Sequence, residues 1–151
     1  MLKKKLGIEC IEDKINNCHI CWFYKVPSTL IIPEGCRRIR SGIFGNCSEL
    51  KKVIIPGSVK EIGDSAFTRC FSLKEVIISE GVERICSCVF IDCDRLEKVV
   101  IPESVVEIYS SAFYGCAGAE IILKKPKSEF KYIGSLAFAG CRVYVKEEAR
   151  G

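Results

Sequence analysis

A repeat of about 23 residues constrains the fold of this chain more than any other feature of its sequence. Phenylalanine recurs at this step, a cysteine follows three residues later, and an isoleucine precedes it. The three sets are Phe44, Phe67, Phe90, Phe113 and Phe138; Cys47, Cys70, Cys93, Cys116 and Cys141; and Ile39, Ile62, Ile85, Ile108 and Ile133. Such a period indicates stacked coils, because one coil can bury its apolar face only against its neighbours.

Each repeat predicts one turn of a solenoid. Val53 and Ile55 alternate with Ile54, so a strand here turns its valine and second isoleucine inward. Pro56 has no backbone N–H and ends the strand. The segment from Ala66 to Cys70 suits a short helical or 3₁₀ turn that closes the coil. Stacking predicts one parallel sheet with right-handed crossings.

The last repeat is aligned by its apolar residues. Ala119 takes the position of Leu96, and Ile122 takes the inward position of Val99. The alignment leaves a two-residue insertion within residues 124–130.

The chain divides into a cap, a repeat array and a tail. Residues 1–26 do not fit the unit and contain Trp22, Phe23 and Tyr24, as expected of a segment that covers an end coil. The polar residues 144–151 predict a frayed tail. The five repeats between them are 27–49, 50–72, 73–95, 96–118 and 119–143.

The repeat unit resembles the BspA-like leucine-rich repeats. The segments Gly63-Asp64-Ser65-Ala66-Phe67 and Ser111-Ala112-Phe113-Tyr114-Gly115-Cys116 carry the resemblance, which covers Pro27 to about Val143. It implies a β-dominated α/β leucine-rich-repeat solenoid of about five coils, with a parallel sheet on one face and short helical or 3₁₀ turns on the other. Such repeats often form adhesion or recognition surfaces. The chain departs from the pattern at Cys86, Cys88, Val89 and Tyr109.

Eleven cysteines raise the question of disulfides and metals. Stacked cysteines in a ladder keep their Cβ vectors parallel, which does not suit the disulfide dihedral. We therefore expect the ladder to consist of buried free thiols. The one cluster with metal-like spacing is Cys10, Cys18, His19 and Cys21. It lacks a second ligand pair, so a packed cap is favoured over zinc, and no cofactor is expected.

Catalysis has little support in the sequence. The chain has one histidine, no nucleophile motif and no phosphate-binding loop. Its net charge of +4 is modest. The basic residues form no single stripe, which disfavours nucleic acid. They are Arg37, Arg38, Arg40, Lys124, Lys125 and Lys127.

The strands point a second set of residues outward, and these are the candidate partner-binding residues. An aliphatic column and a mixed-charge rim are expected on the outer face of the sheet. The column is Ile31, Ile54, Ile77 and Val100, with Leu123 as a candidate continuation, and the rim includes Lys52, Glu75 and Lys98. A contiguous apolar column indicates an interface, although β-propensity alone also favours branched residues in strands. We expect a non-enzymatic scaffold that binds a protein partner. The alternative is a structural homo-oligomer or a fragment of a larger array.

The compartment is open to two interpretations. The basic run at residues 1–5 is interrupted by Glu9, Glu12 and Asp13, unlike a signal peptide. No apolar run approaches the ~18–20 residues of a membrane helix, so no membrane insertion is expected. Reduced cysteines and the missing signal-peptide pattern predict the cytoplasm, and we favour this over the cell surface that the family resemblance implies.

Overall fold

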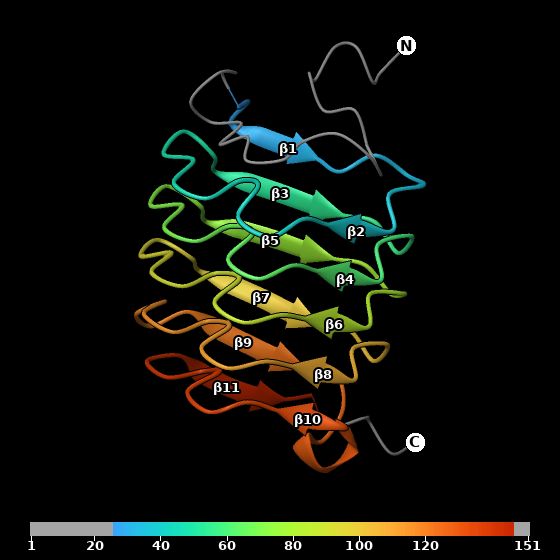
Figure 1. Ribbon diagram of the computed structural model, residues 1–151. Coiled ribbons are helices and arrows are strands. Elements are labelled where there is room, and N and C mark those ends of the chain that lie inside the picture. Colours follow the sequence, from blue (N-terminus) through green and yellow to red (C-terminus); the bar gives the residue numbers. More distant parts are fainter. Residues whose placement is uncertain (1–25, 147–151) are drawn as a thin grey trace.

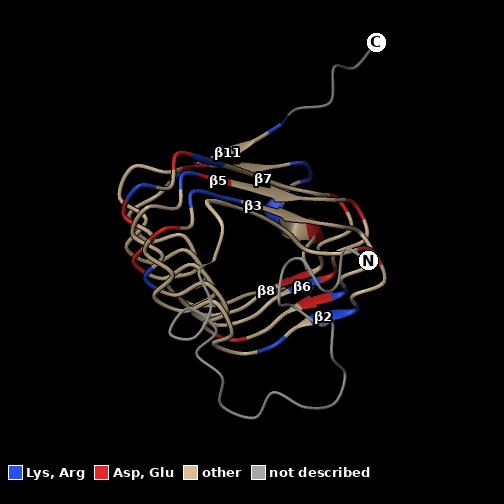
Figure 2. Ribbon diagram, turned by 90° about the horizontal axis from the view of Figure 1, so that it is seen from above, with Lys and Arg blue, Asp and Glu red and all other residues tan. Residues whose placement is uncertain are grey.

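The computed structural model describes residues 26–146, which form a solenoid of about five coils. The coils stack along one axis (Figure 1). Viewed along that axis, two sheets lie on different sides of the core and a stack of turns closes the remaining side (Figure 2). The predicted solenoid is therefore confirmed.

The larger sheet contains one strand from each turn of the chain and is parallel throughout. Its strands alternate buried and outward residues because their side chains point in turn to the two faces. The order is β1 (Thr29–Ile31), β3 (Lys52–Ile55), β5 (Glu75–Ile78), β7 (Lys98–Ile101), β9 (Glu120–Leu123) and β11 (Arg142–Val145).

A second parallel sheet was not predicted from the sequence. Along the chain, one of its strands follows each of the first five strands of the larger sheet. Each of its strands has only two residues, too few to show a period of two in the sequence. The second residue of each strand is an isoleucine of the repeat, and Ile62, Ile85 and Ile108 are fully buried. The strands are β2 (Arg38–Ile39), β4 (Glu61–Ile62), β6 (Arg84–Ile85), β8 (Glu107–Ile108) and β10 (Tyr132–Ile133).

The third side of each coil consists of tight turns, and the prediction of helical segments there was wrong. Ser65 and Arg69 have left-handed φ angles of 55° and 53°, and equivalent residues repeat this conformation in the other coils. A right-handed helix cannot pass through such residues. The amide of Phe67 instead donates to the Val89 carbonyl of the next coil at 2.9 Å. Within the described residues, the one helical element is the 3₁₀ helix η1 (Lys127–Glu129).

Stacked phenylalanine rings form the centre of the core. The Phe67 ring lies 5.2 Å from that of Phe44 and 5.5 Å from that of Phe90, with the rings nearly parallel. All three side chains are fully or almost fully buried. Each coil therefore contributes one ring to a continuous column, as the 23-residue spacing indicated.

The cysteine ladder has a hydrogen-bonding role. The Cys70 thiol donates to the Phe44 carbonyl of the preceding coil at 3.2 Å, and the Cys93 thiol does the same to Phe67 at 3.3 Å. Burial raises the pKa of the Cys70 thiol to about 12, partly offset by a hydrogen bond from the Cys47 backbone. A small side chain with a weak donor thus fits this position.

The expectation of free thiols is confirmed for most of the ladder and wrong at its start. Cys70, Cys93, Cys116 and Cys141 are free. Cys36 and Cys47, in the first coil, are disulfide-bonded. Coil stacking alone predicts parallel thiols, so the disulfide bonding of these two cysteines could not be read from the repeat.

The fifth coil has a different register from the one predicted. Val99 pairs with Ile121, and Val100 pairs with Ile122. Ile121 and Leu123 are fully buried, and Ile122 points outward. The predicted inward position of Ile122 and outward position of Leu123 were therefore wrong. A shift of one residue exchanges the two faces of a strand, and the insertion before Phe130 is correspondingly one residue longer than expected.

The predicted cap lies outside the described residues except for Val26. At the other end, β11 continues to Val145, past the boundary placed at residue 143. The remainder of the predicted tail beyond Lys146 is also outside the described residues.

Candidate functional site: the outer face of the larger sheet

The outer face of the larger sheet carries two straight columns of side chains. The columns are straight because the parallel strands pair in register, so that each residue lies beside the equivalent residue of the next strand. The charged column is Lys52, Glu75, Lys98, Glu120 and Arg142, preceded by Thr29. The apolar column is Ile31, Ile54, Ile77, Val100, Ile122 and Tyr144. We call these two columns together the outer face.

Charges alternate in sign along the charged column. The Lys52 ammonium lies 3.0 Å from the Glu75 carboxylate, and the Arg142 guanidinium lies 3.5 Å from that of Glu120. Lys98, between these pairs, forms no ion pair with any residue from 26 to 146. Exposed ion pairs stabilise a fold by only about 0–1 kcal/mol each. The column therefore adds little to stability, but it gives the face a fixed pattern of charge.

The apolar column is open to solvent along its length. Ile31 is 52% exposed, Ile77 is 37% exposed and Tyr144 is 48% exposed, whereas Ile54, Val100 and Ile122 are partly buried by their neighbours. A single exposed isoleucine is ordinary, but six aligned apolar residues form a continuous strip.

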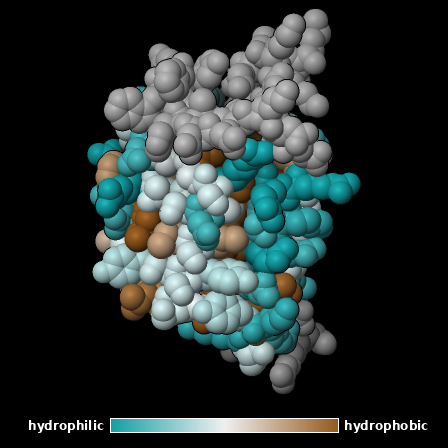
Figure 3. Space-filling view, in the orientation of Figure 1, coloured by the Kyte–Doolittle hydropathy of each residue, from teal (hydrophilic) through white to brown (hydrophobic). Residues whose placement is uncertain are grey.

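The second sheet presents a different surface. Its outward residues are charged and form a network in which Glu61 pairs with Arg38 at 3.0 Å and with Arg84 at 3.4 Å. Lys131 pairs with Glu107 at 3.3 Å. Hydrophilic side chains gather on the side of this sheet (Figure 3). The second sheet therefore offers no apolar strip comparable with that of the outer face.

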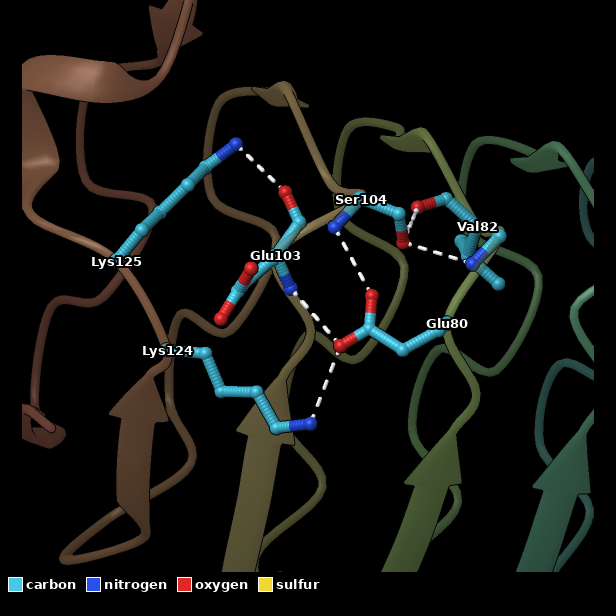
Figure 4. Close-up of polar contacts among 7 residues, drawn as sticks. Glu80, Val82, Glu103, Ser104, Lys124 and Lys125 are labelled. Atoms are coloured by element: carbon cyan, nitrogen blue, oxygen red, sulfur yellow. Dashed lines mark hydrogen bonds and ion pairs between the residues drawn. The ribbon is translucent and has the colours of Figure 1, made fainter. Parts of the chain in front are cut away.

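Loops at the carboxyl ends of the strands hold successive coils together (Figure 4). The Glu80 carboxylate accepts hydrogen bonds from the backbone N–H groups of Glu103 and Ser104, both at 3.2 Å, and from the Lys124 ammonium at 3.1 Å. Burial raises the pKa of Glu80, but these hydrogen bonds outweigh it and lower that pKa below its usual value.

The Ser104 hydroxyl continues the network by donating to the Val82 carbonyl at 2.8 Å and accepting from the Gly81 amide at 2.9 Å. Three coils are thus tied together beside the outer face. Such bonds keep the columns straight and the face rigid.

All seven candidate binding residues of the sequence analysis lie together on the outer face. Four further residues of the outer face were not predicted from the sequence: Glu120, Ile122, Arg142 and Tyr144. Aligning Glu120–Leu123 directly with Lys98–Ile101 would have found the first two, because both segments read as a charge followed by three aliphatic residues. The last two belong to β11, which was divided between the repeat array and the tail.

Other candidate sites gain no support. Cys10, Cys18, His19 and Cys21 lie outside the described residues. Among residues 26–146, no group of three or more histidine, cysteine or acidic side chains could hold a metal ion. The arginines of residues 37–40 lie in the first coil and the lysines of residues 124–127 in the fifth, so they form no shared patch. The described part of the chain contains no helix capable of crossing a membrane.

Two parallel sheets, a phenylalanine column and a ladder of turns define a leucine-rich-repeat solenoid. The comparison with protein families agrees: residues 16–144 match the BspA type leucine rich repeat region in six copies. The chain belongs to this family, as its A-F-x-x-C segments indicated. No curated protein matches the chain.

Solved structures share the fold. A leucine rich cell surface protein from Faecalibacterium prausnitzii A2-165 is 28% identical, with a TM-score of 0.65 over 81% of this chain and 33% of its own. A leucine-rich repeat protein from Bacteroides ovatus ATCC 8483 is 27% identical, with a TM-score of 0.67 over 79% of this chain and 33% of its own. The pneumococcal vaccine antigen PcpA shares the fold at 19% identity, with a TM-score of 0.57 over 80% of this chain and 36% of its own. The chain spans about a third of the length of the first two proteins.

Proposed function

We propose that the protein is a non-enzymatic scaffold that binds a protein partner through the outer face. The observation that carries this proposal is the exposed apolar strip beside a column of alternating charge. Strand propensity accounts for single branched residues, but an aligned strip leaves apolar surface in water, and desolvating that surface against a partner is favourable.

The rigidity of the face supports the same proposal. Its strands are fixed by the sheet and by the loop network around Glu80, so binding costs little conformational entropy. The face also has polar and apolar groups side by side, as protein interfaces do. The leucine-rich-repeat family and fold to which the chain belongs are typically non-enzymatic scaffolds, which supports this proposal.

We propose the exterior of the cell as the compartment. The disulfide-bonded Cys36 and Cys47 favour an oxidising environment. They weaken the argument for the cytoplasm, which rested on reduced cysteines. The F. prausnitzii protein is described as a cell surface protein.

Site-specific photo-crosslinking tests the proposed binding face. A photoreactive phenylalanine analogue would replace Ile77 on the outer face, and a matched variant would carry it at Arg84 on the second sheet. Both positions are exposed. After irradiation in the native cells, we expect protein adducts from position 77 and few from position 84. Equal yields at the two positions, or none at position 77, would contradict the proposal.

A further inference from the structure

We propose that a partner of the outer face is a second copy of this chain, packed face to face about a two-fold axis parallel to the strands. This inference rests on the proposed function, since it identifies the occupant of the same face. Two-fold dimers with one self-complementary surface are the commonest form of association in soluble proteins. The pattern of charges on the outer face is self-complementary in this arrangement.

The number of strands fixes which residues meet. The larger sheet has six strands, so a central axis runs between β5 and β7. Rotation about this axis reverses the order of the coils and retains the direction of each strand. β5 therefore faces β7 of the second copy, β3 faces β9, and β1 faces β11.

Opposite charges meet in every charged pair of the two columns. Lys52 faces Glu120 of the second copy, and Glu75 faces Lys98 of the second copy. Charges alternate along the column, and the rotation pairs even positions with odd ones, so like charges never meet there. Lys98 lacks an ion pair within the described residues, and this contact supplies one.

The apolar strips also coincide. Ile77 meets Val100 of the second copy at the centre, and Ile54 meets Ile122. The most exposed members, Ile31 at 52% and Tyr144 at 48%, meet each other at the ends. The residues with most surface to lose are thus covered together.

Face-to-face packing about a two-fold axis that lies in the interface and runs parallel to the solenoid axis is less favourable. This rotation reverses the strands, so when the apolar columns coincide, the charged column of one copy lies against the residues that follow the apolar column in the other. Lys52 then faces Pro56, Glu75 faces Ser79, and Lys98 faces Pro102. The charge pairing disappears, and this difference selects the axis parallel to the strands.

The size of the face predicts a weak dimer. Six strands at ~4.8 Å and four residues at ~3.3 Å give an area on the order of 400 Å² per copy. That is about half of what each partner buries in a standard stable interface. The dimer should therefore form and dissociate with protein concentration, from about 10 μM to about 1 mM.

Complementary charge reversals test the proposed contact. The Lys52→Glu variant places two glutamates against each other at both symmetry-related contacts of its own dimer, and Glu120→Lys places two lysines there. An equimolar mixture pairs the new glutamate of one variant with the new lysine of the other and retains Lys52 opposite Glu120 at the second contact. Thermal melting of each variant checks that the fold is intact, since both positions are on the surface.

The measurement is sedimentation equilibrium with the wild type, each variant and the mixture. We expect concentration-dependent dimers for the wild type, at least tenfold weaker association for each variant, and recovery in the mixture. A wild type that stays monomeric up to about 1 mM would overturn the proposal. So would a mixture that associates no better than its components.

The outcome separates this inference from the proposed function. Photo-adducts of position 77 with a different protein, together with a monomeric wild type, would overturn self-association and leave the binding role standing. Absence of adducts at position 77 combined with a monomeric wild type would overturn both.

Discussion

Adjacent residues Ile54 and Ile55 give the sharpest test of the strand register, because the structure places them on opposite faces of β3. Ile55 is fully buried in the second coil, whereas Ile54 lies on the outer face and is partly exposed. Lysine at Ile55 removes a buried side chain, which costs about 2–5 kcal/mol. It also places an unpaired charge in a core that contains no buried polar or charged residue among those described, at a further cost of several kcal/mol.

The two costs together approach or exceed the total stability of about 5–15 kcal/mol of an ordinary domain. We therefore expect Ile55→Lys to unfold the coil or to express poorly. Ile54→Lys should change the free energy of unfolding by less than about 1 kcal/mol, because its ammonium stays in water and only strand propensity changes.

Urea unfolding followed by far-ultraviolet circular dichroism measures the difference between the two variants. Ile55→Val provides a control that keeps the position apolar and should cost about 0.5–1.5 kcal/mol. Equal destabilisation by the two lysines, or a greater loss from Ile54→Lys, would refute the register and with it the outer face.

Three further changes address the core, the thiols and the turns. Phe67→Ala should lower the free energy of unfolding by about 3–5 kcal/mol, since the fully buried ring stacks on two others, and Phe67→Leu should lower it less. A melting temperature of Phe67→Ala within a degree or two of the wild type would show that Phe67 is not a core residue. The free energy of unfolding should fall as the pH rises from 9.0 towards about 12, because the folded Cys70 thiol stays protonated where the unfolded one ionises. Urea titrations at several pH values should show a smaller fall for Cys70→Ala than for the wild type. If the free energy of unfolding depends on pH equally in both proteins, burial of Cys70 is not the cause. Gly63→Ala should destabilise the protein by about 1–3 kcal/mol, because the new Cβ would lie 2.6 Å from the Ile39 carbonyl oxygen and 2.7 Å from the Ser41 nitrogen. Gly42→Asn is the control, since Gly42 has a left-handed φ and open space around it. Equal melting temperatures for the wild type and Gly63→Ala would contradict the close approach.

Much of the candidate site could be predicted because the repeat couples sequence to position. Residues that share a place in the unit share a face, so the spacing alone assigns Ile54 and Ile77 to one column. The prediction was wrong at Leu123, where a one-residue change of spacing after Ala119 is hidden by the longer insertion that follows. A strand tolerates no such error, because one step moves a side chain from the core to solvent.

The turns show a different reason for error. Ala66 and Phe67 are compatible with a helical turn, and nothing in their identity indicates the left-handed Ser65 and Arg69. Those conformations are adopted because the amides of alternate residues then reach the carbonyls of the next coil, as Phe67 does with Val89. The neighbouring coil, not local propensity, selects the backbone here.

The sequence by itself determined that the chain is a solenoid, that phenylalanine and cysteine form its core, and that an aliphatic column lies outside the sheet. Periodic spacing suffices for these conclusions, since equivalent residues of stacked coils must lie above one another. The tertiary structure decided the second sheet, the turn conformations, the register of the fifth coil and the alternating ion pairs of the outer face. These depend on hydrogen bonds and charges that cross from one coil to the next, and such contacts exist only once the coils are stacked.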